Sequence, residues 1–139
     1  MQRGLMVLAI VLAGTRAGVA AGAVAIGMPS DVASEGVSMG MSSKYDTMDE
    51  ARASAITECK KHGSAATKAL CKVVATFQNQ CVSMAIDPEP GTPGFGWAIA
   101  DNVPAATDQA VANCRDSAGA SRRDACVPDG KPQCDGTAQ

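Results

Sequence analysis

Six cysteines are the residues of this chain whose type and spacing carry the most chemical information. Thiols pair as disulfides in an oxidising compartment, whereas clustered thiolates can instead bind zinc. Zinc is the weaker alternative, because there is no Cys-x-x-Cys pair and His62 is the only histidine. The missing Cys-x-x-Cys also removes the usual basis for proposing a disulfide oxidoreductase. We therefore expect disulfides, with no metal site and no cofactor.

Few other residues suggest catalysis. A Ser-His-Asp or Cys-His arrangement would have to use His62, which follows Lys60 and Lys61 in an expected loop, where an exposed histidine is the simpler interpretation. The glycines of the segment 91–96 resemble a phosphate-binding loop, but a strand follows them, not a helix N-terminus. Paired carboxylates of the glycosidase type stay open, because the chain has 14 acidic residues whose separation the sequence does not give.

Two aromatic residues form a candidate binding surface. In Phe95-Gly96-Trp97 the alternation of a strand places Phe95 and Trp97 on the same face. Packing in the core is one interpretation. If the pair is exposed, it is a contact surface for a partner protein or a glycan.

The first residues have the order of a secretory signal. Gln2 and Arg3 are followed by an apolar stretch, and small residues come before a cleavage site after Ala20 or Ala21. An uncleaved anchor is the alternative, but Arg16 interrupts the apolar run before the roughly 20 residues that span a bilayer. We expect a signal peptide over 1–21, a mature domain over 22–139 with no stable membrane span, and a secreted or periplasmic location.

Charge and composition limit the partners and the core. Loss of Arg3 and Arg16 moves the formal net charge from −2 to −4, and an acidic protein is a poor match for nucleic acid or anionic lipid. The chain has one Trp, one Tyr and two Phe, and much of its hydrophobic content is alanine, which buries little area. Such a core benefits from covalent crosslinks.

The chain contains an internal repeat. The segment 47–59 aligns without a gap on the segment 102–114, and the same shift of 55 positions carries Cys71 onto Cys126. A third cysteine follows in each copy, Cys81 or Cys134. Two copies of one supersecondary unit are therefore expected, over 22–80 and 81–136.

Each aligned segment is predicted to be a helix with an alanine-lined face. Thr47 and Glu50 form a capping-box pattern, and Asn102 is an equally good cap before Pro104. Small or apolar residues then recur every three or four positions and end at a cysteine. They are Met48, Ala51, Ala55 and Cys59 in one copy and Val103, Ala106, Ala110 and Cys114 in the other.

Short segments that suit strands surround each helix. Before the helices they are 23–27 and 36–41 in the first copy and 82–87 and 94–100 in the second, and 71–77 follows the first helix. The prediction is an α+β fold of two pseudo-symmetric strand-strand-helix-strand repeats, with antiparallel sheet and two helices.

The second copy departs from the pattern at its end. Pro128 and Pro132 cannot donate to a ladder, so a turn or a distorted edge segment is expected there. The tail after Cys134 is expected to be disordered.

The repeat also narrows the pairing of the cysteines, for which six thiols allow fifteen arrangements. If both halves fold alike, each helix-end cysteine bonds to the next cysteine of its own copy. The remaining two, taken as equivalent positions, would join across a pseudo-two-fold axis. The expected pairs are Cys59–Cys71, Cys114–Cys126 and Cys81–Cys134.

Four of these segments together resemble an exported bacterial family, the domain of unknown function 4189. They are the start at 22–26, the alanine-rich helix ending at Cys59, the segment 71–81 and the Gly-Phe-Gly-Trp strand at 94–97. The resemblance covers nearly the whole mature chain and implies an exported, disulfide-stabilised, two-repeat domain with no established reaction. The proline-containing terminal segment departs from the regular strand of that family.

These features favour a non-enzymatic binding protein of the cell envelope or secreted fraction. It would act on a protein, or on a glycan, as an inhibitor, an immunity-type partner or a host-directed factor. A small cell-wall-directed hydrolase with dispersed carboxylates is the alternative from another class, and a structural envelope component is the third.

Overall fold

A computed structural model describes residues 20–139. The predicted signal peptide lies outside these residues except for Ala20 and Ala21. The strands are β1 (Ala21–Gly27), β2 (Ser38–Tyr45), β3 (Lys72–Phe77), β4 (Cys81–Ile86), β5 (Phe95–Ala100) and β6 (Val127–Cys134). The helices are α1 (Val32–Glu35), α2 (Met48–Cys59), α3 (Ala65–Ala69), α4 (Val103–Ser117) and the 3-10 turn η1 (Arg123–Ala125). None of the helices in the described part of the chain has the length and apolar character needed to cross a bilayer.

The strands form two antiparallel sheets of three strands, one for each repeat. The order is β2-β1-β3 in the first sheet and β5-β4-β6 in the second, so the first strand of each repeat is central. Equivalent residues pair in both sheets, since Ala25 lies opposite Gly40 and Ala85 lies opposite Gly96. The predicted α+β fold of two pseudo-symmetric repeats is confirmed.

The two long helices begin at the predicted caps. The Thr47 hydroxyl accepts from the Glu50 N–H at 3.2 Å and donates to the Glu50 carboxylate at 2.9 Å. The Asn102 side-chain oxygen, Oδ1, accepts from the Ala105 N–H at 2.9 Å. A side chain that satisfies a free first-turn N–H explains why both helices begin at these residues.

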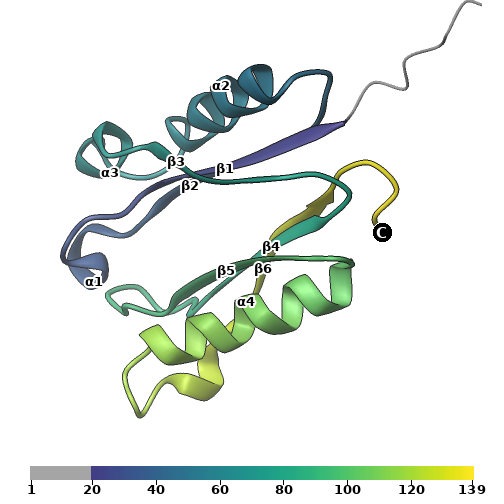
Figure 1. Ribbon diagram of the computed structural model, residues 1–139. Helices are drawn as coiled ribbons and strands as arrows, with labels where there is room; N and C mark the ends of the chain where they lie inside the picture. Colours follow the sequence, from purple (N-terminus) through teal and green to yellow (C-terminus); the bar gives the residue numbers. More distant parts are fainter. Residues whose placement is uncertain (1–19) are drawn as a thin grey trace, which may run out of the picture.

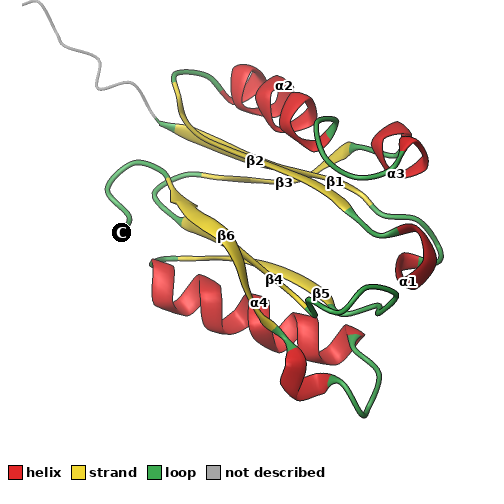
Figure 2. Cartoon of the chain, turned by 180° about the vertical axis from the view of Figure 1, so that it is seen from behind, coloured by secondary structure: helices red, strands yellow, loops and turns green. Residues whose placement is uncertain are grey.

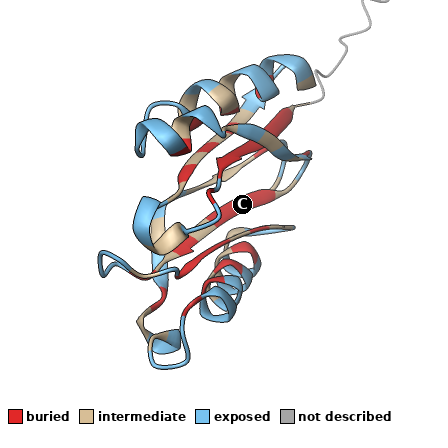
Figure 3. Cartoon of the chain, turned by 90° about the vertical axis from the view of Figure 1, so that its left-hand side faces the viewer, coloured by how far each residue is buried: buried red, intermediate tan, exposed pale blue. Residues whose placement is uncertain are grey.

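The molecule has four layers, in which a helix covers the outer face of each sheet and the two sheets face one another (Figure 1). The same order of α2, two sheets and α4 is visible from behind (Figure 2). Buried residues follow the strands and the inner sides of the helices (Figure 3). The predicted alanine faces point inward, because Ala51, Ala55 and Cys59 of α2 are fully buried against β1.

Small and bulky side chains occupy different layers of the interior. Alanine and cysteine fill the two spaces between a helix and its sheet. The larger residues meet between the sheets, in a cluster of Val24, Ile26, Phe77, Val82 and Phe95. The few bulky side chains of this chain therefore join the two repeats to each other, while each helix lies close to its own sheet.

Glycine permits that close approach. A Cβ atom on Gly40 would lie closer than 3.0 Å to backbone atoms of Ala55 and Cys59 in α2. A Cβ atom on Gly96 would meet Ala110 and Cys114 of α4 in the same way. The two glycines are thus equivalent positions at which the helix backbone rests on the strand.

The disulfides of the structure are Cys59–Cys71, Cys114–Cys126 and Cys81–Cys134, the three expected pairs. The first two join the end of a long helix to the segment before the last strand of the same repeat. The third is not a bond across a pseudo-two-fold axis. Cys81 begins β4 and Cys134 ends β6, and the two residues lie opposite each other in the second sheet. They are therefore not equivalent positions of the two repeats.

Of the two structures expected for the proline-containing segment, a turn or a distorted edge segment, the chain has the second. Residues 127–134 form an edge strand, which accommodates its prolines because only one of its sides pairs with β4. The register with β4 shifts between Val82 and Met84, so the strand is distorted as expected of an edge segment.

The tail after Cys134 packs on the body of the protein, contrary to the expected disorder. The buried Asp135 carboxylate accepts from the Lys44 N–H at 3.0 Å, and the Asp135 N–H donates to the Gln80 carbonyl at 2.9 Å. The Gln139 carbonyl accepts from the Val103 N–H at 3.0 Å. The tail thereby contacts both repeats.

Candidate binding surface

Phe95 and Trp97 share one face of β5, as the alternation predicts, and this face is turned toward the other sheet. They are not an exposed pair. Phe95 is 9% exposed and belongs to the cluster between the sheets, whereas Trp97 packs at the border of that cluster and remains partly accessible. The structure therefore divides the predicted surface into a core residue and a partly exposed indole.

Trp97 lines a hollow of about 500 Å³ that both sheets border. We call it the edge hollow; its other lining residues are Ile26, Met28, Pro29, Ser30, Leu70, Lys72 and Val74. Three of the five exposed large hydrophobic side chains of the described residues line it: Met28 at 49%, Leu70 at 45% and Val74 at 40%. A concentration of exposed apolar groups around one hollow is typical of a contact surface.

Sequence reasoning missed Met28, Leu70 and Val74. Met28 lies in the turn after β1, and Leu70 follows the short helix α3, whose cap is the hydrogen bond from the Thr67 N–H to the Ser64 hydroxyl at 3.2 Å. Serine is a favoured helix N-cap, so Ser64, three positions before Thr67, is a sequence signal that could have revealed α3. Val74 is exposed because the register of β3 with β1 shifts beside it, between Val24 and Ala25.

A second hollow of about 420 Å³ runs along the outer edge of β5, on the other side of Trp97. Here side chains of α4 form hydrogen bonds with backbone groups of β5. The Ser117 hydroxyl accepts from the Phe95 N–H at 2.9 Å, and the Asn113 amide donates to the Trp97 carbonyl at 2.8 Å. Such bonds make this edge less available to another strand.

The edge of β3 differs from that of β5. β1 pairs with one side of β3, and within residues 20–139 no strand pairs with its other side. No side-chain hydrogen bond to the backbone of β3 is found in the described part of the chain. The edge hollow therefore adjoins a strand edge that is open to solvent.

A third cavity, of about 520 Å³, lies between the sheets near α1. Its lining is mainly apolar, with Val37, Met39 and Phe95 among its residues, and His62, Asp87 and Asp129 add titratable groups. His62 is an exposed loop residue, as expected. Within the described residues no three His, Cys, Asp or Glu side chains come together as a metal site.

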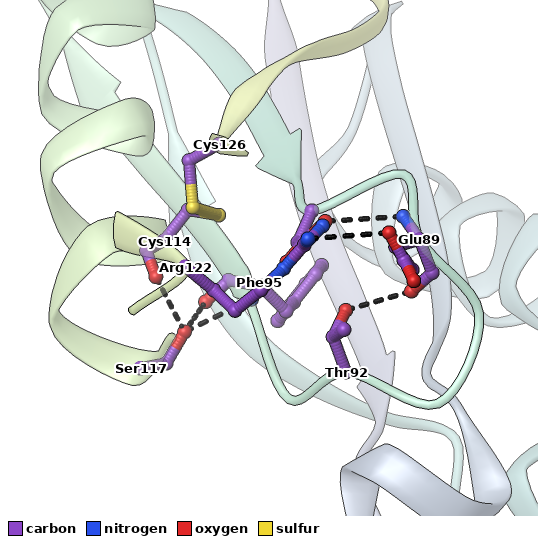
Figure 4. Close-up of a disulfide and its surroundings, with 8 residues drawn as sticks. Glu89, Thr92, Phe95, Cys114, Ser117, Arg122 and Cys126 are labelled. Carbon is purple, nitrogen blue, oxygen red and sulfur yellow. Dashed lines mark hydrogen bonds and ion pairs between the residues drawn. A yellow bond between two sulfur atoms is a disulfide. The ribbon is translucent and has the colours of Figure 1, made fainter. Parts of the chain in front are cut away.

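Asp87 forms a bidentate ion pair with Arg122, which is labelled together with Glu89 in Figure 4. The Arg122 guanidinium donates to both carboxylate oxygens, at 2.7 and 2.6 Å, and also lies 3.2 Å from Glu89. The hydrogen bonds from Arg122 lower the pKa of Asp87 to about 2, burial opposes this, and the Glu89 N–H contributes further lowering. The pair fixes the 87–94 loop, whose two ends are joined by the bond from the Asp87 N–H to the Gly94 carbonyl at 2.9 Å.

We expect Asp87→Asn to lower the free energy of unfolding at pH 7, because the variant loses the charge that pairs with Arg122. The folded-state pKa lies below the ordinary value of 3.8, so the unfolded state binds more protons as the pH falls from 3.8 toward 2. The stabilising effect is complete above this range and is lost within it. Urea unfolding at a series of pH values measures the difference from the wild-type protein.

The matched control is Asp116→Asn, which removes an exposed ion pair with Arg123 and should change stability little. A deficit of Asp87→Asn that stays constant from pH 7 to pH 2 would contradict the assigned role of the Asp87 charge.

The family comparison covers most of the described residues. The sequence model of a family described as "Domain of unknown function (DUF4189)" matches residues 21–131, which include both sheets except for the last part of β6. No curated protein and no solved structure matches the chain. Since the match extends over most of its length, the chain belongs to the DUF4189 family.

Proposed function

We propose that this protein is an exported, non-enzymatic interaction protein that binds a partner protein through the edge hollow. The observation that carries the proposal is the clustering of Met28, Leu70 and Val74, all exposed, beside the partly exposed Trp97. A tryptophan surrounded by accessible apolar side chains is the composition that binding hot spots favour.

The crosslinks support both export and binding. Three disulfides in one small domain are typical of proteins that fold in an oxidising compartment, which here means the periplasm or the extracellular space. The bond between Cys59 and Cys71 also anchors the start of β3, one wall of the edge hollow, to the end of α2. A surface held rigid before binding loses less conformational entropy when a partner docks.

The hydrolase alternative loses one candidate for its general acid. A general acid needs a pKa near the working pH, and the pKa of Asp87, in the cavity between the sheets, is lowered to about 2. Asp87 would be ionised at neutral pH and could not donate a proton. A glycosidase mechanism would thus need its acid from another carboxyl group.

Site-specific photo-crosslinking tests the proposal. The oxidised mature protein would carry a photoreactive amino acid either at Val74 or at Val127, which is 44% exposed but lies on β6. After incubation with the secreted and envelope fractions of its source cells, we expect a discrete protein adduct from position 74 only. Leu70→Asp, a change at an exposed side chain, should abolish that adduct.

The outcome against the proposal is equally definite. Equal adducts from both positions would contradict binding through the edge hollow. No adduct from position 74, together with peptidoglycan turnover in an activity screen, would favour the hydrolase over the binding protein.

A further inference from the structure

The chain has one segment that is basic and free of acidic residues, and its last lysine, Lys72, lines the edge hollow. Residues 59–86 contain four of the six lysines, and none of the 14 acidic residues. The remainder of the mature chain is correspondingly rich in Asp and Glu. An acidic protein therefore has one basic segment, and this segment includes α3 and β3.

One of these lysines, Lys72, lines the edge hollow, and the other three lie in the loop that ends just before it. The disulfide between Cys59 and Cys71 closes a loop that contains Lys60, Lys61 and Lys68, with Cα atoms 6.0 Å apart at its base. Lys72 follows directly, is exposed, and lines the edge hollow together with Leu70 and Val74. Of the four, Lys61 forms an ion pair with Glu58. Cationic and apolar groups thus border the same depression.

The strand that carries Lys72 and Val74 has an open edge, which adds a third property to this surface. An extended peptide can bind such an edge through main-chain hydrogen bonds, while alternate side chains enter pockets beside it. The edge hollow, at about 500 Å³ and with Trp97 on its far wall, offers such a pocket. Of the two edge strands that border the edge hollow, β5 is partly occupied by Ser117 and Asn113, which leaves the edge of β3 available.

We propose that the partner segment is an extended peptide of alternating apolar and acidic residues that adds as a strand to β3. This inference rests on the proposed function and names the chemistry of the partner. Apolar side chains of the peptide enter the edge hollow against Trp97, and its carboxylates lie near Lys68 and Lys72. A basic peptide is disfavoured because it would meet like charges.

Trp97 provides the measurement, because it is the only tryptophan of the chain and lies in the site. The probe is a synthetic peptide of alternating valine and glutamate, titrated into the oxidised protein while the Trp97 emission is recorded. We expect a saturable change in emission that weakens with added salt. Lys68→Glu together with Lys72→Glu should raise the Kd about tenfold, whereas Lys131→Glu on β6 should leave it unchanged.

Three further probes separate this inference from its alternatives. They are the same peptide with lysine in place of glutamate, the acidic peptide with alternate backbone amides methylated, and vesicles of phosphatidylglycerol. The first and third should not bind, and amide methylation should weaken binding about tenfold, since it removes donors to the edge of β3. Equal binding of the basic peptide, no effect of methylation, or preferential binding to the vesicles would overturn the inference.

The crosslink from position 74 tests the proposed function independently of the peptide titration. If no peptide binds but the crosslink from position 74 persists, the inference of an acidic extended peptide is wrong, while the proposed binding function is retained. If that crosslink is also missing, both fail.

Discussion

Replacing either Gly40 or Gly96 with alanine is expected to lower the free energy of unfolding by about 3 kcal/mol. Small domains are stable by only about 5–15 kcal/mol, so this is a large effect for the addition of one methyl group. Urea unfolding of the oxidised protein, followed by circular dichroism, measures it.

The physical reason is contact with backbone atoms. A methyl group on Gly40 would overlap the Ala55 carbonyl oxygen and the Cys59 nitrogen, and one on Gly96 would overlap the equivalent atoms of Ala110 and Cys114. A side chain could rotate away, but these atoms can move only if the helix lifts from its sheet. That movement would open the alanine-lined layer and lose the dispersion contacts that close packing provides.

The control is Gly119→Ala. A methyl group there has no atom within 4 Å, and the residue does not have a positive φ, so the change should alter stability by about 0.5 kcal/mol or less. The two test positions are equivalent in the repeats and should give similar losses. Tolerance of alanine at Gly40 or Gly96, to the degree seen at Gly119, would show that the helices do not rest on these strands.

Local features of the fold could be predicted from the sequence because short-range chemistry determines them. Thr47 and Asn102 begin helices through hydrogen bonds to residues three positions ahead, and the alanine stripes follow from helical periodicity. Because the two halves align, a helix predicted in one half could also be predicted in the other. Even Gly96, recognised only as the small residue between Phe95 and Trp97, has a counterpart at Gly40.

The arrangement of the two halves depends on long-range contacts that no local pattern contains. The sequence indicates that Phe95 and Trp97 share a face, but burial of that face depends on Val24 and Phe77 of the other repeat. The edge hollow has the same origin, because its walls come from β1, β3 and β5. The four lysines of 59–86 can be counted in the sequence, but only the edge position of β3 brings one of them, Lys72, to this surface.

Removing the disulfide between Cys81 and Cys134, by changing both residues to alanine, should cost about 4 kcal/mol, more than the loss of either of the other two. Its cysteines are 53 positions apart, against 12 for each of the other pairs, and a longer closed loop restricts the unfolded chain more. The chain-entropy relation gives about 3 kcal/mol for each shorter loop. Urea unfolding of the three double variants measures the order.

The structure also predicts which residues will lose protection from hydrogen exchange when this disulfide is removed. β6 contains two prolines without N–H groups and a shifted register, so Cys134 fixes a strand whose ladder is incomplete. The tail that follows it is bonded to the first repeat through Asp135. Hydrogen exchange should accelerate in 127–139 when Cys81 and Cys134 are replaced, and much less in the first sheet. If the variant without Cys59–Cys71 loses more stability, loop length does not determine the contribution of these bonds. If hydrogen exchange rises uniformly, the Cys81–Cys134 bond does not act by holding β6 in place.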